Sequence, residues 1–400
     1  MPKHAKRLVA KLILITTVLT ILPGQVQAVR DETSKVTPTF LHGKVKVTVL
    51  EPTVMAPSPG NTQGILAISR TGVVAAFYES YKTANPKEGY RYRTSHDAGR
   101  TWSEPRLFPA KMAGSAMYGA LRNGGVVKMT GQAVPLAKRK PGKPGPRRIL
   151  FSDDFMKYQS DPAEVDLSTF PASMSRGTPK GVFYPVFDKG KMLERPNGDL
   201  LATMYGVLEG DTQYRTMIVI SRDKGLNWRY VTTVAYEAED PNPEFPGDWD
   251  GYCEPSMAKL LNGQLLCMMR TEGATPPYKP MYTSRSKDMG RTWTRPVPTR
   301  PHLQNAWPTL AVLDSGVVAC IYGRPGVHVV FSTDNGRTWT DRVTLTNHTT
   351  TWGKPGTNIS CYADLIKAGP NRLLAIAAVG SGGTQVFPIE VNARGIGVLP

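Results

Sequence analysis

Six stretches of the chain share one pattern of hydrophobic and polar positions: an apolar run, a turn, and a second apolar run. The turn carries a glycine in five of them, and Asn371-Arg372 in the last. Short apolar runs bounded by turn residues are typical of buried strands, and no helical periodicity competes with them. The predicted hairpins span residues 65–77, 120–129, 192–205, 257–269, 309–322 and 365–379.

A second pattern follows four of these hairpins, the octet Ser-x-Asp-x-Gly-x-(Thr or Asn)-Trp. We expect the Asp to accept backbone hydrogen bonds inside a turn, the Gly to adopt a positive φ, and the Trp to pack back against the strands. Ser152-Asp153-Asp154 is a degenerate copy in the long gap after the first octet. The four octets span residues 95–102, 221–228, 286–293 and 332–339.

Each octet or degenerate copy closes a second hairpin, so each repeat contains four strands. Six such repeats closed in a ring form a six-bladed β-propeller, an all-β fold whose closure leaves only short sheet edges. We therefore predict one propeller domain over residues 29–400, made of four-stranded antiparallel blades.

The N-terminus is typical of a secretory signal peptide. It begins with basic residues, continues through the apolar run 12–22, and reaches the small-residue pattern Val26-Gln27-Ala28. We expect cleavage after Ala28 and a secreted or periplasmic protein; the alternative is an uncleaved N-terminal anchor. No later segment approaches the ~20 apolar residues of a membrane helix, so we expect no membrane span in the mature chain.

Composition and charge limit the class of protein, the kind of partner and the role of the cysteines. The chain has 400 residues, 40% of them hydrophobic and 20% charged, which excludes disordered and fibrous classes. The formal net charge of +17 favours an anionic partner, and nucleic acid suits an exported propeller poorly. Four cysteines make neither a disulfide framework nor a zinc pattern, so we expect buried free thiols, no metal and no cofactor.

Counting a fixed number of residues back from the turn of each hairpin locates the residues that surround the centre of the ring. Residues at equal offsets before the turn start equivalent innermost strands, and they surround the mouth of the central channel, where a propeller keeps its pocket. These positions are more polar and aromatic than a repeated core position would be. Nine residues before the turn stand Gln63, Ala116, Lys189, Glu254, Trp307 and Tyr362, which are called the ring positions below.

The octets resemble the Asp-boxes, or BNR repeats, of the sialidase (neuraminidase) superfamily. The segment from Cys253-Glu254 to Arg270 is similar to the one that links the catalytic Glu of the family to the second arginine of its triad. Arg324 is similar in placement to the third arginine, and Tyr362-Ala363-Asp364-Leu365 to the segment bearing the nucleophile.

This resemblance implies an exo-α-sialidase-like glycoside hydrolase that acts on a glycan. A tyrosine has a pKa near ~10 and needs a base, which Glu254 would supply to Tyr362. The tyrosine would form a covalent glycosyl-enzyme, and a neutral attacker suits a sugar that carries a carboxylate. Arg270 and Arg324 would hold that carboxylate; the alternative for these two arginines is pairing with acidic residues between blades. The alternative for Glu254 is a structural carboxylate that caps a loop, and that for Tyr362 is an aromatic residue that lines the channel.

The chain departs from the family pattern at two points. Gln63 stands at the ring position where the family has its first arginine; it can donate a hydrogen bond to the substrate but supplies no charge. Arg91 or Arg93 is a possible replacement. The acid/base Asp expected before the first octet is absent, which leaves Glu88, with Glu79 second.

Two other functions stay open. One is hydrolysis or lysis of another polysaccharide, of arabinan type or containing uronic acid, in which Glu254 and a second carboxylate do the chemistry and Tyr362 supports Glu254. The other is a noncatalytic propeller that binds a glycan without cleaving it.

Overall fold

Strands make up almost all regular structure, and one 3₁₀ turn is the only helical element among the described residues. The computed structural model describes residues 39–42, 45–57, 64–79, 90–109, 116–134, 145–172, 184–271, 277–304, 306–323, 326–347, 363–379 and 383–393. They all belong to one compact unit, Ser34–Pro400. No helix in these ranges is long and apolar enough to cross a membrane. The predicted signal peptide, residues 1–28, lies outside them and stays a prediction.

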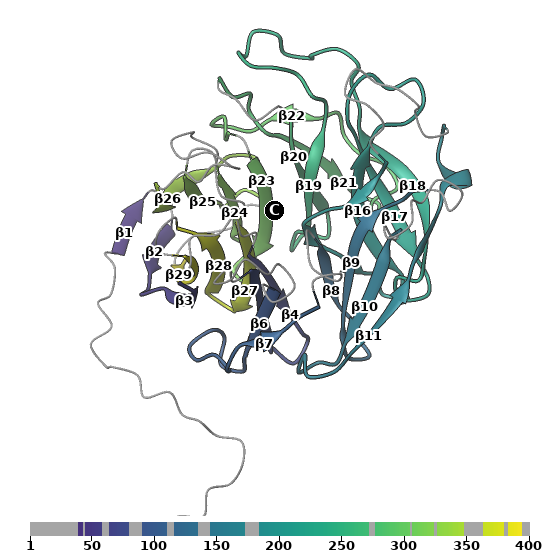
Figure 1. Ribbon diagram of the computed structural model, residues 1–400. Coiled ribbons are helices and arrows are strands. Elements are labelled where there is room, and N and C mark those ends of the chain that lie inside the picture. The colour runs from purple at the N-terminus through teal and green to yellow at the C-terminus, as the bar shows by residue number, and fades with distance from the viewer. Residues whose placement is uncertain are drawn as a thin grey trace, which may run out of the picture. The chain divides into compact units, whose positions relative to one another are not determined.

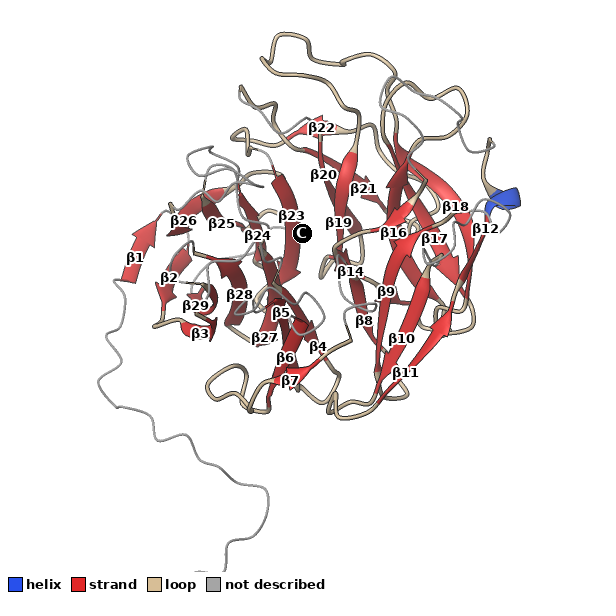
Figure 2. Ribbon diagram, in the orientation of Figure 1, coloured by secondary structure: helices blue, strands red, loops and turns tan. Residues whose placement is uncertain are grey.

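The described strands form five sheets (Figures 1 and 2), and they are grouped here in chain order into six repeats, because the sheet of eleven strands contains two of them. Repeat 1 contains β4 (Ile65–Ile68), β5 (Val74–Glu79), β6 (Tyr90–Ser95) and β7 (Arg106–Leu107). Repeat 2 contains β8 (Met117–Ala120), β9 (Val126–Gln132), β10 (Arg147–Phe151) and β11 (Tyr158–Pro162). Repeat 3 contains β14 (Gly190–Lys191), β15 (Leu193–Glu194), β16 (Leu200–Gly206), β17 (Arg215–Ser221) and β18 (Asn227–Ala235).

The second half of the chain continues the series. Repeat 4 contains β19 (Cys253–Lys259), β20 (Leu265–Arg270), β21 (Tyr282–Ser286) and β22 (Val297–Pro298). Repeat 5 contains β23 (Ala306–Val312), β24 (Val318–Gly323), β25 (Val327–Ser332) and β26 (Thr340–Thr346). Repeat 6 contains β27 (Asp364–Gly369), β28 (Arg372–Ala378) and β29 (Thr384–Asn392), with β1 (Thr39–His42), β2 (Val45–Val49) and β3 (Thr53–Ala56) from the N-terminal end.

Short elements join repeats 2 and 3 into one sheet. β13 (Val186–Phe187) pairs with both β9 and β16 in antiparallel fashion. β12 (Glu164–Asp166), which precedes the 3₁₀ turn η4 (Leu167–Thr169), adds a parallel strand to β18. β14 pairs with β8 in parallel.

All six hairpins expected from the sequence are present as antiparallel strand pairs, so the predicted all-β fold is confirmed. The first strand of each repeat (β4, β8, β14, β19, β23 and β27, called the inner strands below) contacts the inner strand of the next repeat, and β27 contacts β4. The inner strands therefore form a closed ring. β2, from the beginning of the chain, completes repeat 6 by pairing with β29 from its end (Figure 1).

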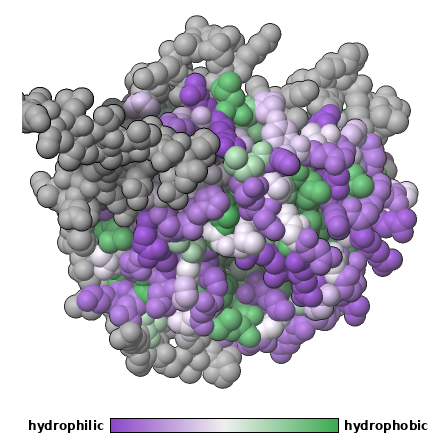
Figure 3. Space-filling model, turned by 90° about the horizontal axis from the view of Figure 1, so that it is seen from below, coloured by the Kyte–Doolittle hydropathy of each residue, from purple (hydrophilic) through white to green (hydrophobic). Residues whose placement is uncertain are grey.

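The apolar core is divided among the interfaces between repeats. Each of six hydrophobic clusters in the described residues draws its members from two consecutive repeats. Every residue of β20, β24 and β28 is buried, because neighbours cover both faces of these second strands. Among the residues coloured by hydropathy in Figure 3, most are hydrophilic, with scattered hydrophobic patches between them.

The octets form the expected turns between the third and fourth strands. In the first, Asp97 accepts hydrogen bonds from Arg100 N, Thr101 N and Thr101 Oγ1, and Gly99 has a φ of 79°. Those bonds lower the pKa of the Asp97 carboxyl against the opposing effect of its partial burial. The structural role predicted for the octet aspartates is confirmed.

The degenerate octet keeps part of this geometry. Ser152 Oγ donates to Asp154 Oδ1 at 2.5 Å, which is the bond that Ser95 makes to Asp97. The turn lies between β10 and β11, the same place in repeat 2 that the octets take elsewhere.

One buried carboxylate links three inner strands. Asp364, at the start of β27, is fully buried and accepts from Leu66 N on β4 at 2.9 Å and from Lys191 Nζ on β14 at 2.8 Å. Lys191 Nζ also donates to the Leu66 carbonyl. The last repeat is thereby tied to the first and, across the ring, to the third.

Replacing Asp364 by Ala should therefore destabilise the fold strongly. Removing one partner of a buried ion pair leaves the other charge uncompensated, and we expect a loss of about 3 kcal/mol in the free energy of unfolding. Urea unfolding followed by circular dichroism measures it. The matched control is Asp314→Ala, which removes the partner of Lys367 in an exposed ion pair and should cost less than about 1 kcal/mol. Equal losses in the two variants would contradict the linking role of Asp364.

Candidate active site

Two ring positions share an unusual backbone conformation. Glu254 and Trp307 are the second residues of consecutive inner strands, β19 and β23, and have φ angles of 44° and 46°. A non-glycine residue in this left-handed region costs roughly 1–2 kcal/mol. Each residue lies within a register shift that interrupts its hairpin. Bulges of this kind re-aim side chains and are common beside active sites, so the repeated bulge turns the same position of both strands out of the regular pleat.

The Glu254 carboxylate is buried and fixed from two sides. Arg270, on the neighbouring strand β20, donates from Nη1 to Oε1 at 2.5 Å, and Trp307 donates from its backbone N–H to Oε2 at 3.2 Å. Both side chains of the ion pair are less than one-tenth exposed. Because burying two charges is costly, such a pair persists only with good geometry and further hydrogen bonds, and this one has both.

Lys189 adds a cation to the same cluster. Its side chain is 1% exposed, and Nζ lies 5.2 Å from the centroid of the Trp307 ring, within range of a cation–π interaction. Within the described residues this ammonium group makes no hydrogen bond. Burial lowers the pKa of Lys189 to about 8, a shift that the negative charge of Asp364 opposes.

Asp188 places a second carboxyl beside Glu254. It lies in the link between β13 and β14 and is 6% exposed. Burial, reinforced by the negative charge of Glu254, raises the pKa of Asp188 to about 7, although Lys189 N and the Tyr205 hydroxyl hydrogen-bond to the carboxyl. Burial and the charges of Asp188 and Glu254 raise the pKa of Tyr205 well above its usual value.

The cluster therefore holds two carboxyls in different surroundings. Glu254 is paired with a guanidinium group, whereas Asp188 keeps its proton up to about neutral pH. Two carboxyls whose environments differ in this way are the usual arrangement for dividing base and acid roles in catalysis. The described part of the site can thus supply one paired carboxylate, one proton donor and one buried ammonium group.

Of the site residues predicted from the sequence, the structure brings Glu254 and Arg270 together. Gln63, Arg324 and Tyr362 lie outside the described residues, and their roles stay predictions. So does that of Glu88, which also lies outside them. The backbone of Glu79 pairs with Tyr90 in repeat 1, and its side chain is outside the description.

The ring offset also selected Lys189 and Trp307, which join this cluster, and Ala116, which lies in the apolar cluster between repeats 1 and 2. Of the two arginines considered as replacements for the missing one, Arg93 donates from Nε to the Tyr78 hydroxyl at 3.2 Å.

Sequence reasoning missed Asp188 and Tyr205. Asp188 immediately precedes the ring position Lys189, so including the residue ten positions before each turn would have selected it. Tyr205 lies on the second strand of repeat 3 and carries no such signal.

Within the described residues, no group of three His, Cys, Asp or Glu side chains is placed to hold a metal ion. Cys253, Cys267 and Cys320 are buried free thiols, as expected, and burial raises the pKa of each. Cys361 lies outside the described residues.

Comparison with known proteins gives one match to a family model and several solved structures of similar fold. Residues 163–371 match the family model described as a BNR repeat-like domain. A sequence search of curated proteins finds no match.

Three solved structures illustrate the likeness of fold. A protein of unknown function from Dyadobacter fermentans has a TM-score of 0.62 and 18% identity, over 86% of this chain and 99% of that one. The Hadza microbial sialidase Hz136 has a TM-score of 0.54 and 14% identity, over 82% of this chain and 65% of that one. The α-L-arabinanase of Penicillium chrysogenum, solved with arabinobiose, has a TM-score of 0.56 and 15% identity, over 87% of this chain and 99% of that one. These neighbours confirm the predicted sialidase-like fold class.

The raised pKa of Asp188 predicts a pH-dependent stability. A carboxyl whose pKa is about 7 in the folded chain and ~3.9 unfolded binds its proton more tightly when folded, so its contribution to stability is lost as pH rises from about 4 to 7. Asp188→Asn removes this loss. The unfolding free energy of the variant minus that of the native chain should rise by up to about 1.4 kcal/mol per pH unit between pH 5 and 7. Urea unfolding at several pH values measures it, and a difference that stays constant with pH would contradict the assignment.

Proposed function

The chain belongs to the BNR repeat-like domain family, and on that premise we propose that it is a secreted glycoside hydrolase that releases a terminal acidic sugar, sialic acid first among them, from a glycan. The observation that carries this proposal is the buried Glu254–Arg270 pair at the ring of inner strands, with Glu254 in a left-handed bulge. Export would follow cleavage after Ala28.

Glu254 acts in this proposal as the base for Tyr362. The tyrosine oxygen attacks the anomeric carbon while its proton passes to the Glu254 carboxylate, and the bond to the leaving group breaks. A covalent glycosyl-enzyme results; water then attacks the anomeric carbon, the bond to the Tyr362 oxygen breaks, and Glu254 returns its proton to that oxygen. The hydrogen bonds from Arg270 and Trp307 fix the position of the carboxylate, which a proton transfer of this kind requires.

Asp188 is the proposed proton donor to the leaving group, a role for which the sequence offered Glu88 and Glu79. A general acid works best when its pKa lies near the operating pH, and that of Asp188 is about 7. After the leaving group departs, the resulting carboxylate takes a proton from the attacking water, which restores the acid.

The sugar carboxylate would be held by Arg270, Arg324 and Gln63, with Lys189 supplying the charge that Gln63 lacks. The Lys189 ammonium group has no hydrogen bond within the described residues, so a substrate carboxylate would give it a partner. The formal net charge of the whole chain is +17, and cleavage after Ala28 would remove four positive charges and no acidic residue, so the secreted chain would stay basic, which favours an anionic substrate.

A second function has its own support in the pairing of Asp188 with Glu254. Two carboxyls with different environments are what a hydrolase of neutral sugars, of arabinan type, uses without a tyrosine nucleophile. In that case Tyr362 only supports Glu254.

Fluorophore release from an aryl α-sialoside tests the proposal. The chain from residue 29 should release the fluorophore, and Glu254→Gln should reduce kcat by at least a hundredfold, because an amide cannot accept the tyrosine proton. Absence of release from folded protein would exclude the sialic-acid assignment.

Tyr362→Phe then separates the mechanisms. Loss of turnover with retained binding indicates a tyrosine nucleophile, whereas a modest loss on an arabinan substrate indicates the two-carboxylate mechanism. Binding of a glycan without turnover of any substrate by the native chain would leave only a binding protein.

Lys189→Met tests how the acidic sugar is held. Because the ammonium group is buried without a hydrogen bond in the described residues, its removal should leave the fold intact. We expect KM for the sialoside to rise about tenfold, the size typical of one charged hydrogen bond, with a smaller change in kcat. The control is Lys259→Met, on an exposed position at the end of β19. An unchanged KM would remove Lys189 from the substrate site.

A further inference from the structure

A cavity of about 620 Å³ lies between repeats 3 and 4, away from the ring positions described above. Its lining comes from β15–β18 of repeat 3 and from the octet turn between β21 and β22 of repeat 4. Its volume falls in the range of small-ligand sites. It is bordered by two octet turns, which the proposed function does not use.

Four arginines line this cavity: Arg195, Arg222, Arg229 and Arg291. Asp223 is the only acidic residue among the lining residues, and its carboxylate is occupied by its own turn. It accepts from Asn227 N at 2.9 Å, from Asn227 Nδ2 at 2.7 Å and from Ser221 Oγ at 2.8 Å. The cavity is therefore strongly positive.

Within the described residues, the guanidinium groups of Arg195 and Arg229 make only long ion pairs, with Asp199 and Asp166 respectively. The nearest carboxylate oxygens to Arg195 and Arg229 lie at 3.9 and 3.8 Å, beyond hydrogen-bond distance. In the described part of the chain, no hydrogen bond or ion pair involves the guanidinium groups of Arg222 and Arg291.

Among the residues that the structure describes, the lack of a hydrogen bond from the guanidinium group of Arg291 is particular to this octet turn. Arg100 and Arg337 occupy the same octet position as Arg291, directly after the glycine. Arg100 donates to the Asp97 carbonyl at 3.1 Å and Arg337 to the Asp334 carbonyl at 3.3 Å. Arg291 makes no such bond and lines the cavity instead.

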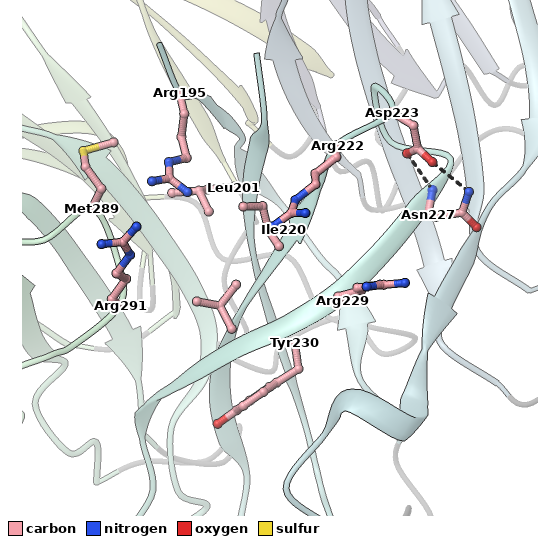
Figure 4. Close-up of a pocket in the computed structure, with 11 residues that line it drawn as sticks. Arg195, Leu201, Ile220, Arg222, Asp223, Asn227, Arg229, Tyr230, Met289 and Arg291 are labelled. Carbon is pink, nitrogen blue, oxygen red and sulfur yellow. Dashed lines mark hydrogen bonds between the residues drawn. The ribbon is translucent and has the colours of Figure 1, made fainter. Parts of the chain in front are cut away.

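Apolar side chains lie between the cations. Figure 4 draws Arg195 and Arg222 on either side of Leu201 and Ile220, with Tyr230 below them. An apolar surface suits the C–H face of a sugar ring, and guanidinium forks suit carboxylate or sulfate groups.

We infer that this cavity is a second binding site, for an anionic saccharide bearing carboxylate or sulfate groups. The site lies on the octet turns and not at the inner strands, so it binds a saccharide without cleaving it. The inference does not depend on the hydrolase activity proposed above.

Isothermal titration calorimetry tests it in the Glu254→Gln background, in which turnover contributes no heat. The probes are a galacturonate trisaccharide, a chondroitin sulfate disaccharide, neutral maltotriose and inorganic sulfate. We expect one or both acidic saccharides to bind. The double variant Arg222→Ala/Arg291→Ala should raise the Kd of the acidic saccharides about tenfold and weaken the dependence of that Kd on salt concentration.

The matched control is Arg100→Ala/Arg337→Ala, which removes the same charge from octet turns that do not line the cavity. Its Kd should stay within twofold of the parent. Equal effects of the two double variants, or no binding of either acidic saccharide, would overturn the inference. Binding of inorganic sulfate as tight as that of the saccharides would overturn the saccharide assignment.

Discussion

The second strands of the described repeats carry apolar side chains on both faces, and this one constraint governs the rest of the structure. A sheet of this kind needs a neighbour on each side, so a linear row of repeats would leave two apolar faces exposed at its ends. Joining the last repeat to the first removes both ends, and each of the six hydrophobic clusters then lies between two consecutive repeats. The pairing of β2 with β29 makes the closure depend on the two ends of the folded chain.

Closure also collects charged groups where the inner strands meet. Asp364 and Lys191 neutralise one another there, and so do Glu254 and Arg270. Such pairs add little net stability, because desolvation offsets much of their attraction, but they fix the positions of the strands and of the carboxylate. Asp188 and Lys189 are less completely neutralised, and their shifted pKa values of about 7 and about 8 mark the part of the ring where chemistry at neutral pH is feasible.

The octet turns belong to a different part of the same scaffold. Their aspartates are satisfied by local hydrogen bonds, so each turn is structurally complete. The variable positions of the octet are then free to differ from repeat to repeat without cost to the fold. Between repeats 3 and 4 those positions, together with the β15–β16 turn and β18, supply the arginines of the cavity. Scaffold and binding chemistry are therefore separated residue by residue within one motif.

The amino-acid sequence by itself determined the hairpins, the octet turns and the all-β fold class, because period, turn chemistry and glycine placement act over a few neighbouring residues. It also located Lys189, Glu254 and Trp307, since equal offsets on equivalent strands reach equal heights in the ring. Only the tertiary structure decided that Arg270 pairs with Glu254, that Asp188 is buried and faces the charge of Glu254, which together raise its pKa, and that arginines of two repeats share one cavity. These contacts join residues on different strands or repeats, and their free energies arise from burial and charge that exist only after the ring has closed.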